Sequence, residues 1–210
     1  IRDFSEYGFP GYIRSAHLHD MTGSDAKVLS GQYHLKTVID LRTAIEREEM
    51  PDYGMAGVEY LHIPLFDEAR AGISHEKSTR DMGVMIPDMP DLYRRIVTDE
   101  CSAAQIKEVI EILNDNSREG AVLWHCTEGK DRCGIISACF LLSKGIDKDT
   151  VMRDYLKTNE SAEKRAAYYY GVALEKSGNR EMAEKVRNAF LAKREYMEPV
   201  IDILAQFMQA

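Results

Sequence analysis

One stretch of the chain constrains its fold and chemistry more than any other, because two apolar runs flank a short polar loop. The first run, residues 121–124, has the length and composition of a buried strand, and the second, residues 135–142, those of a helix. The loop between them begins with Cys126 and ends with Arg132. A strand, a tight loop and a helix N-terminus direct backbone N–H groups at an anion. The stretch therefore predicts an anion-binding loop.

The two ends of this loop indicate a reaction. We expect the pKa of the Cys126 thiol to be lowered, because the loop amides and the Arg132 guanidinium favour the thiolate. A thiolate is a ready nucleophile at neutral pH, and the planar fork of Arg132 can hold two oxygens of a tetrahedral anion. These residues predict covalent phosphoryl transfer, in which the thiolate attacks phosphorus and a phosphocysteine is then hydrolysed.

Residues 125–134 read His-Cys-Thr-Glu-Gly-Lys-Asp-Arg-Cys-Gly, and they resemble the His-Cys-x5-Arg loop of the cysteine-dependent phosphatases. More closely, the loop resembles that of an atypical bacterial subgroup of protein-tyrosine and dual-specificity phosphatases, His-Cys-x-x-Gly-Lys-Asp-Arg-Thr-Gly. The subgroup acts on phosphoproteins and phosphoinositides. Residues 12–16, 40–46 and 154–159 also resemble elements of this family. The departure is Cys133, where the family has Thr or Ser.

The resemblance implies a role for each residue of the loop. Cys126 would be the nucleophile, Arg132 would bind the phosphoryl oxygens, and Asp131 would be the general acid and base. The wider superfamily instead takes its acid from an Asp after the strand that we predict at residues 58–63, which makes Asp67 a competing candidate. The predicted phosphate-binding residues are Thr127, Glu128, Gly129, Lys130, Asp131 and Arg132. The predicted supporting residues are His125, Cys133, Asp67, Arg42 and Arg14.

Three basic residues each leave two interpretations open. Arg14 could line the phosphate site or form a surface salt bridge. Arg42, at the end of a predicted strand, could support the loop or pair with Glu46 at i,i+4 on the next helix. Lys130 could contact a polyanionic head group or be a solvated lysine.

Cys133 leaves three interpretations open. The family's hydroxyl would donate a hydrogen bond to the catalytic sulfur, and a thiol is a weaker donor. Breakdown of the phosphocysteine would then be slower. Alternatively, Cys133 could form a reversible disulfide with Cys126, or simply pack at the start of the helix.

Strand and helix patterns alternate along the chain, which predicts an α/β fold with a mostly parallel central sheet and helices on both faces. The resemblance implies a three-layer, phosphotyrosine protein phosphatase-like fold with a C-terminal helical cap. We expect a single domain over residues 1–210, with residues 155–193 as a helical lid. The predicted strands are 37–41, 58–63 and 121–124. The predicted helices are 22–30, 90–97, 102–114 with Ser102 as its cap, 147–157, and two or three between 161 and 207.

Composition narrows the class of partner. The net charge of −8 argues against nonspecific nucleic-acid binding, which needs a basic face. No apolar run approaches the roughly 20 residues that span a bilayer. The four cysteines do not form a disulfide framework in a chain of this length, and Cys126 and Cys133 lack the spacing of a zinc site. We therefore expect no metal, no cofactor and no integral membrane segment.

These observations predict a metal-independent phosphomonoester hydrolase that acts on phosphotyrosine, with phosphoserine, phosphothreonine and phosphoinositides as further substrates. Two alternatives stay open: a pseudophosphatase-like module that binds phosphoproteins without turnover, and a rhodanese-type sulfurtransferase. The expected partner is a phosphorylated protein or phosphoinositide. We expect a cytoplasmic location. Because the chain begins at Ile1 rather than Met, a secreted form with a removed signal peptide also stays open.

Overall fold

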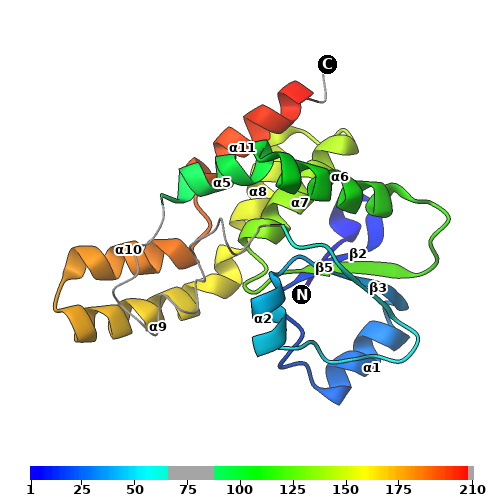
Figure 1. The fold of residues 1–210 in the computed structure, drawn as a ribbon, viewed down its shortest axis with the longest axis horizontal. Coiled ribbons are helices and arrows are strands. Elements are labelled where there is room, and N and C mark those ends of the chain that lie inside the picture. The colour runs from blue at the N-terminus through cyan, green and yellow to red at the C-terminus, as the bar shows by residue number, and fades with distance from the viewer. Residues whose placement is uncertain (66–87, 208–210) are drawn as a thin grey trace. The chain divides into compact units, whose positions relative to one another are not determined.

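The structure is a computed structural model that describes residues 1–65 and 88–207 (Figure 1). Its described part falls into two compact units. The first comprises Ile1–Glu68 and Asp99–Ile136, and the second comprises Ala69–Thr98 and Ser137–Ala210. Since residues 121–134 lie within the first unit, the predicted catalytic loop is built entirely on that unit. Asp67 lies outside the described residues.

The first unit is organised around a five-stranded sheet with the strand order β1-β2-β5-β3-β4. Strands β2, β5, β3 and β4 are parallel to one another, and only β1 is antiparallel to its neighbour β2. The strand bounds are Arg2–Phe4 (β1), Phe9–Ser15 (β2), Leu35–Asp40 (β3), Glu59–His62 (β4) and Ala121–His125 (β5). The predicted mostly parallel sheet is confirmed. The prediction did not include β2, because Pro10 and Gly11 interrupt its apolar pattern.

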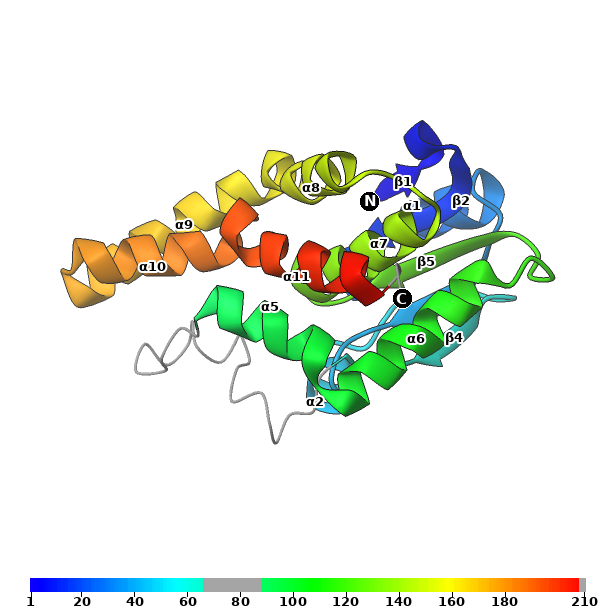
Figure 2. The same ribbon diagram turned by 90° about the horizontal axis from the view of Figure 1, so that it is seen from above.

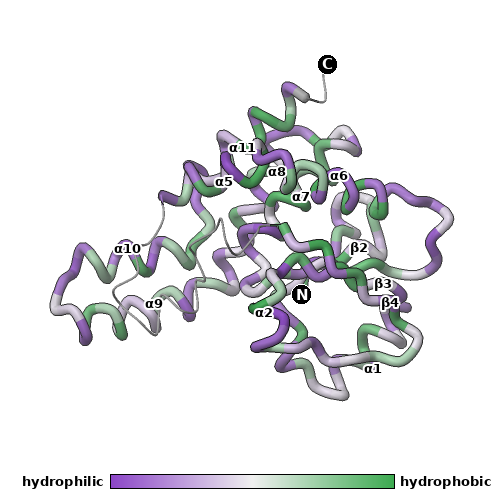
Figure 3. Tube along the Cα trace, viewed as in Figure 1, coloured by the Kyte–Doolittle hydropathy of each residue, from purple (hydrophilic) through white to green (hydrophobic). Residues whose placement is uncertain are grey.

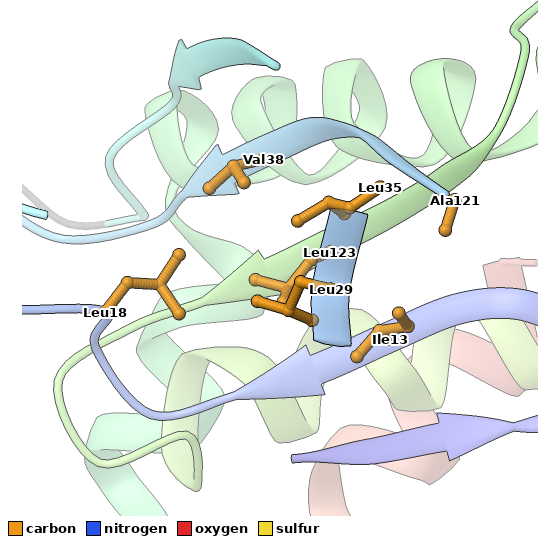
Figure 4. Packing of buried hydrophobic residues seen from close by; sticks show 7 residues of the cluster. All are labelled: Ile13, Leu18, Leu29, Leu35, Val38, Ala121 and Leu123. Atoms are coloured by element: carbon orange, nitrogen blue, oxygen red, sulfur yellow. The ribbon is translucent and has the colours of Figure 1, made fainter. Parts of the chain in front are cut away.

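Helices cover both faces of this sheet, as predicted. Helices α1 (Gly23–Gly31) and α6 (Glu100–Asn114) lie on opposite sides of β5 in both Figure 1 and Figure 2. On the α1 face, Leu29 packs with Ile13 of β2 and Leu123 of β5 (Figure 4). On the α6 face, the hydroxyl of Tyr12 donates to the backbone carbonyl of Leu113 at 2.9 Å. The sheet that carries the loop is thus fixed from both sides.

The helix starts follow from local side-chain chemistry. Thr22 caps α1 in a capping box with Asp25, as its Thr-x-x-Asp spacing indicates. In α6 the predicted cap was wrong: Asp99 caps the helix and accepts from the backbone N–H of Ser102 at 3.0 Å, while Ser102 is buried inside the helix. Both residues have a capping side chain, and the carboxylate, placed nearer the positive end of the helix dipole, gains more there.

The second unit is helical in its described part. Its helices are α5 (Met89–Thr98), α8 (Lys148–Leu156), α9 (Asn159–Ser177), α10 (Arg180–Phe190) and α11 (Arg194–Phe207), together with the C-terminal part of α7 (Asp131–Ser143). Helices α9 and α10 run side by side, and hydrophilic and hydrophobic residues alternate along them (Figure 3). The three helices expected between 161 and 207 are present. That residues 155–193 act as a lid, and that the chain forms a single domain, stay predictions.

None of the helices in the described ranges combines the length and the apolar character that crossing a membrane requires.

Candidate active site

The predicted site lies where the parallel strands end. In the register of the sheet, His125 at the end of β5 is the partner of Ser15 in β2 and of Asp40 in β3. Carboxyl ends of parallel strands share one edge of a sheet, and ligands bind at that edge in open α/β folds. The loop that starts with Cys126 therefore emerges between two strand ends.

Helix α7 starts earlier than predicted. It begins at Asp131 rather than at 135, and its first backbone hydrogen bond runs from Gly134 N–H to the carbonyl of Lys130 at 2.8 Å. The charged residues hid this start in an apolar pattern, yet an acidic residue in the first turn suits the positive end of the helix dipole. Arg132 therefore projects from the first turn of a helix, which holds its backbone rigid.

The loop is tied to the end of β2 at a point where only glycine fits. Gly129 has a φ of +66°, and a Cβ atom there would lie 2.6 Å from the carbonyl oxygen of Ser15. The backbone N–H of His17 donates to the carbonyl of Thr127 at 3.2 Å. Arg14 is buried and donates to the carbonyl of Gly129 at 3.0 Å. The surface salt bridge considered for Arg14 is therefore wrong, and the residue supports the loop through its backbone.

Cys126 is buried at the start of the loop, with 2% of its surface exposed. Burial raises the pKa of this thiol. A hydrogen bond from the side chain of Cys133, the charge of Arg132 and the backbone N–H of Cys133 lower it more, whereas Asp131 opposes them slightly, and the resulting pKa is about 6. Most of the Cys126 side chains are then thiolates at pH 7. This is the lowered pKa that the sequence predicted.

Cys133 stands where the family has a hydroxyl, and it donates to Cys126 in place of that hydroxyl. Its sulfur also lies 3.7 Å from the carbonyl oxygen of Ser15 and 3.9 Å from that of Trp124. Burial and the neighbouring Cys126 thiolate raise the pKa of Cys133 well above its ordinary value. Cys133 thus keeps its proton and remains a donor whenever Cys126 is ionised.

Arg132 is held by a carboxylate from the neighbouring helix α2 (Ala44–Glu49). Its two terminal nitrogens donate to the two oxygens of Glu46 at 2.6 and 2.7 Å. Glu46 also caps α2 by accepting from the backbone N–H of Thr43, and it accepts from the hydroxyl of Thr127 in the loop. This end-on pairing leaves the Nε–H edge of the guanidinium for a side-on pair with phosphoryl oxygens.

The sequence assigned Glu46 to the wrong partner. The i,i+4 pair with Arg42 was an open interpretation, but Arg42 precedes α2 and is buried, and the carboxylate of Glu46 takes Arg132 instead. The sequence signal for the true pair is weak, because the two residues are far apart in the chain. The register of β3 beside β5 brings them together.

Arg42 belongs to a buried charge network beneath the loop. It donates to both oxygens of Asp40, lies 2.9 Å from an oxygen of Asp52, and donates to the carbonyl of Met50 at 2.7 Å. On its other side, Asp52 lies 2.9 Å from Nε2 of His125. The sequence analysis missed Asp52, since the residue follows Pro51 outside any motif or periodic segment.

Two carboxylates and an imidazole of this network have the chemistry of metal ligands. The ligand atoms of Asp40, Asp52 and His125 lie within 4.8 Å of one another. However, the guanidinium of Arg42 contacts both carboxylates and already supplies the positive charge between them. The group therefore fits an arginine-centred network better than a metal centre.

Asp131 and Lys130 form a close pair at the end of the loop. Nζ of Lys130 lies 3.2 Å from Oδ1 of Asp131, and Lys130 is buried, with 2% of its surface exposed. The interpretation of Lys130 as a solvated lysine is therefore wrong. Glu128 is partly exposed. Because Asp67 lies outside the described residues, the choice between Asp131 and Asp67 as general acid stays a prediction.

A thiolate that starts a loop, with an arginine fork in the first helical turn after it, is the arrangement by which cysteine-dependent phosphatases bind and attack phosphate esters. A sequence model of the tyrosine phosphatase family matches residues 10–208. The chain belongs to the tyrosine phosphatase family.

Individual relatives agree with this family. A tyrosine-protein phosphatase of Nostoc commune is 31% identical over 146 residues, which are 69% of this chain and 47% of that protein. The triple specificity protein phosphatase PtpB of Mycobacterium tuberculosis is 32% identical over 97 residues, 46% of this chain and 34% of PtpB. The chain thus spans less than half the length of these curated relatives. A crystal structure of Tk-PTP is 18% identical, with a TM-score of 0.40 over 94% of this chain and 91% of that one.

Proposed function

We propose that this chain hydrolyses phosphomonoesters through a phosphocysteine intermediate, and that phosphotyrosine in proteins is its first class of substrate. The observation that carries the proposal is the ionised Cys126 in a loop that ends in the helix-anchored Arg132. The pKa of about 6 supplies a nucleophile at neutral pH. The arginine fork, held by Glu46, is already positioned for the charge that develops on the phosphoryl oxygens.

The reaction would proceed in two displacements. The Cys126 sulfur forms a bond to phosphorus as the bond from phosphorus to the leaving oxygen breaks, and Asp131 donates a proton to that oxygen. A water molecule, deprotonated by Asp131, then attacks phosphorus and the sulfur leaves as a thiolate. The Cys133 thiol donates to this departing sulfur, and Arg132 stabilises the phosphoryl oxygens in both steps.

The range of substrates is a proposal that extends from the relatives. The printed name of PtpB assigns triple specificity to that protein. We propose that this chain accepts phosphotyrosine, and that phosphoserine, phosphothreonine and phosphoinositides are to be tested against it. Lys130, which lies beside the predicted acid, would add a second positive charge for substrates with several phosphates. We also propose a cytoplasmic location.

The test is release of inorganic phosphate from p-nitrophenyl phosphate and from a phosphotyrosine peptide, in the presence of excess EDTA. We expect turnover by the unmodified chain and none by Cys126→Ser. Tight binding of the phosphopeptide without phosphate release would contradict hydrolysis and favour a pseudophosphatase. Formation of thiocyanate from thiosulfate and cyanide, with no phosphate release, would favour sulfur transfer.

A further inference from the structure

Asp52 connects the buried charge network to the residue before the nucleophile. Its Oδ2 lies 2.9 Å from Nε2 of His125. Its Oδ1 lies 2.9 Å from Arg42 and accepts from the backbone N–H of Leu18 at 3.1 Å. Both oxygens of the carboxylate are therefore used by groups that come from different parts of the first unit.

The contacts of the His125 ring define how many protons it carries. Nδ1 lies 3.4 Å from the backbone carbonyl oxygen of Cys126, which can only accept, so the proton of this hydrogen bond belongs to the ring. Nε2 faces the carboxylate of Asp52. Burial raises the pKa of Asp52, but the hydrogen bond and charge of His125 and the charge of Arg42 lower it further, so the carboxylate is ionised and also only accepts. An imidazole that donates from both nitrogens is an imidazolium.

The charges around this ring agree with a cationic form. Asp52 and, at 3.8 Å, Asp40 are the acidic groups near Nε2. Arg42 contacts both carboxylates, and its charge compensates one of them. A neutral His125 would leave the buried group with a net negative charge, which is costly. An imidazolium brings the four side chains to neutrality.

Asp40 does not fill the same role. It accepts from the backbone N–H and from Nε and a terminal nitrogen of Arg42, at 2.8 to 3.0 Å. Its distance of 3.8 Å from His125 exceeds that of a hydrogen bond. Asp52 is therefore the carboxylate that the ring contacts directly.

We propose that Asp52 is a positioning residue of the active site, which holds the ring of His125 as an imidazolium directed at the backbone of Cys126. The cation would lie one residue before the nucleophile and would favour its thiolate, in addition to the contributions of Arg132 and Cys133. The groups that oppose this effect on Cys126 are burial and the charge of Asp131. The inference rests on the proposed function, since it adds a residue to the same site.

The test measures the thiolate directly, without a substrate. The rate at which iodoacetamide alkylates Cys126 is followed from pH 4.5 to 9 in the unmodified chain and in Asp52→Asn, which keeps the shape of the side chain but removes its charge. Peptide mass spectrometry assigns the alkylated cysteine. Asp20→Asn is the matched control, because Asp20 is an exposed carboxylate close in sequence to Leu18.

We expect the midpoint of alkylation to move upward by about one pH unit in Asp52→Asn, so that the rate below the midpoint falls about tenfold. The control should keep the midpoint of the unmodified chain. A midpoint unchanged in a folded Asp52→Asn variant, checked by circular dichroism, would overturn the proposal. If phosphate release fails while the alkylation midpoint shifts, the proposed function is wrong but the role of Asp52 stands.

A second measurement needs no variant, and it decides the matter if Asp52→Asn does not fold. The nitrogen chemical shifts of the His125 ring, measured by NMR near pH 7, distinguish an imidazolium from either neutral tautomer. We expect both nitrogens to be protonated. A single neutral tautomer in the unmodified chain would overturn the proposal.

Discussion

Glu46→Gln tests how the structure prepares Arg132 for phosphate. In the structure both oxygens of Glu46 accept from Arg132, and they also accept from Thr127 and from the backbone N–H of Thr43. Glutamine has the same shape but only one accepting oxygen, and its NH2 group would face donors. The variant should therefore release one side of the guanidinium and leave the rest of α2 in place.

The magnitude follows from the hydrogen bonds that are lost. A hydrogen bond to a charged group contributes about 1.5–3 kcal/mol. Losing one of the two Arg132–Glu46 bonds, and the charge behind the other, should cost about 2–3 kcal/mol of arginine positioning. If this loss is felt in the transition state, kcat/KM should fall by about 30- to 150-fold.

The assay is steady-state hydrolysis of p-nitrophenyl phosphate by the unmodified chain, Glu46→Gln and Glu48→Gln. Glu48 is an exposed residue of the same helix, so its variant removes a charge without touching Arg132. The control should keep kcat/KM within about twofold, a change of about 0.4 kcal/mol. If folded Glu46→Gln also stayed within about threefold of the unmodified chain, Glu46 would have no part in positioning Arg132.

The same variant has a signature in acid. Burial raises the pKa of Glu46, but the hydrogen bonds and charge of Arg132 and the hydroxyl of Thr127 hold it far below the ordinary value of 4.5. A carboxyl whose folded pKa is depressed stabilises the fold above its unfolded pKa, and this contribution disappears as the pH falls. The free energy of unfolding, measured with urea from pH 7 to pH 3, should therefore decline less steeply in Glu46→Gln.

Three further variants test other parts of the site. Cys133→Thr should raise kcat when phosphocysteine breakdown limits the rate, because a hydroxyl is the better donor to the Cys126 sulfur; an unchanged or lower single-turnover breakdown rate would show that the thiol is no handicap. Asp131→Asn should lower kcat strongly for phenyl phosphate and much less for a substrate whose leaving group needs no proton, and an equal loss on both would argue against Asp131 as the acid. Gly129→Ala should lower both activity and the denaturation midpoint, since its Cβ would lie 2.6 Å from the Ser15 carbonyl; a stable, active variant would mean that the loop backbone can move.

The sequence allowed the strand, loop and helix around Cys126 to be predicted, because local periodicity and a specific motif coincide there. It could not predict β2, whose pattern is broken by Pro10 and Gly11 although the sheet stabilises it. The true partner of Glu46 was also hidden, since strand pairing rather than helical spacing brings Arg132 to it. Tertiary register of this kind leaves no trace in a local pattern.

Asp52 illustrates the same difficulty more sharply. Nothing in the sequence around it distinguishes it from a solvent-exposed carboxylate after a proline. Its significance comes from three contacts, with Leu18, Arg42 and His125, which are made by segments far apart in the chain. Residues that act through another side chain are therefore the part of a site that a sequence reveals least.

Covalent trapping of the intermediate tests the account most directly. The unmodified chain and Cys126→Ser are mixed with p-nitrophenyl phosphate, quenched in acid within milliseconds to seconds, and digested for peptide mass spectrometry. We predict a phosphoryl group on Cys126 in the unmodified chain, formed before the steady state, and no adduct or turnover in Cys126→Ser. Phosphate release without an adduct at any quench time, together with undiminished hydrolysis by Cys126→Ser, would contradict nucleophilic catalysis by Cys126.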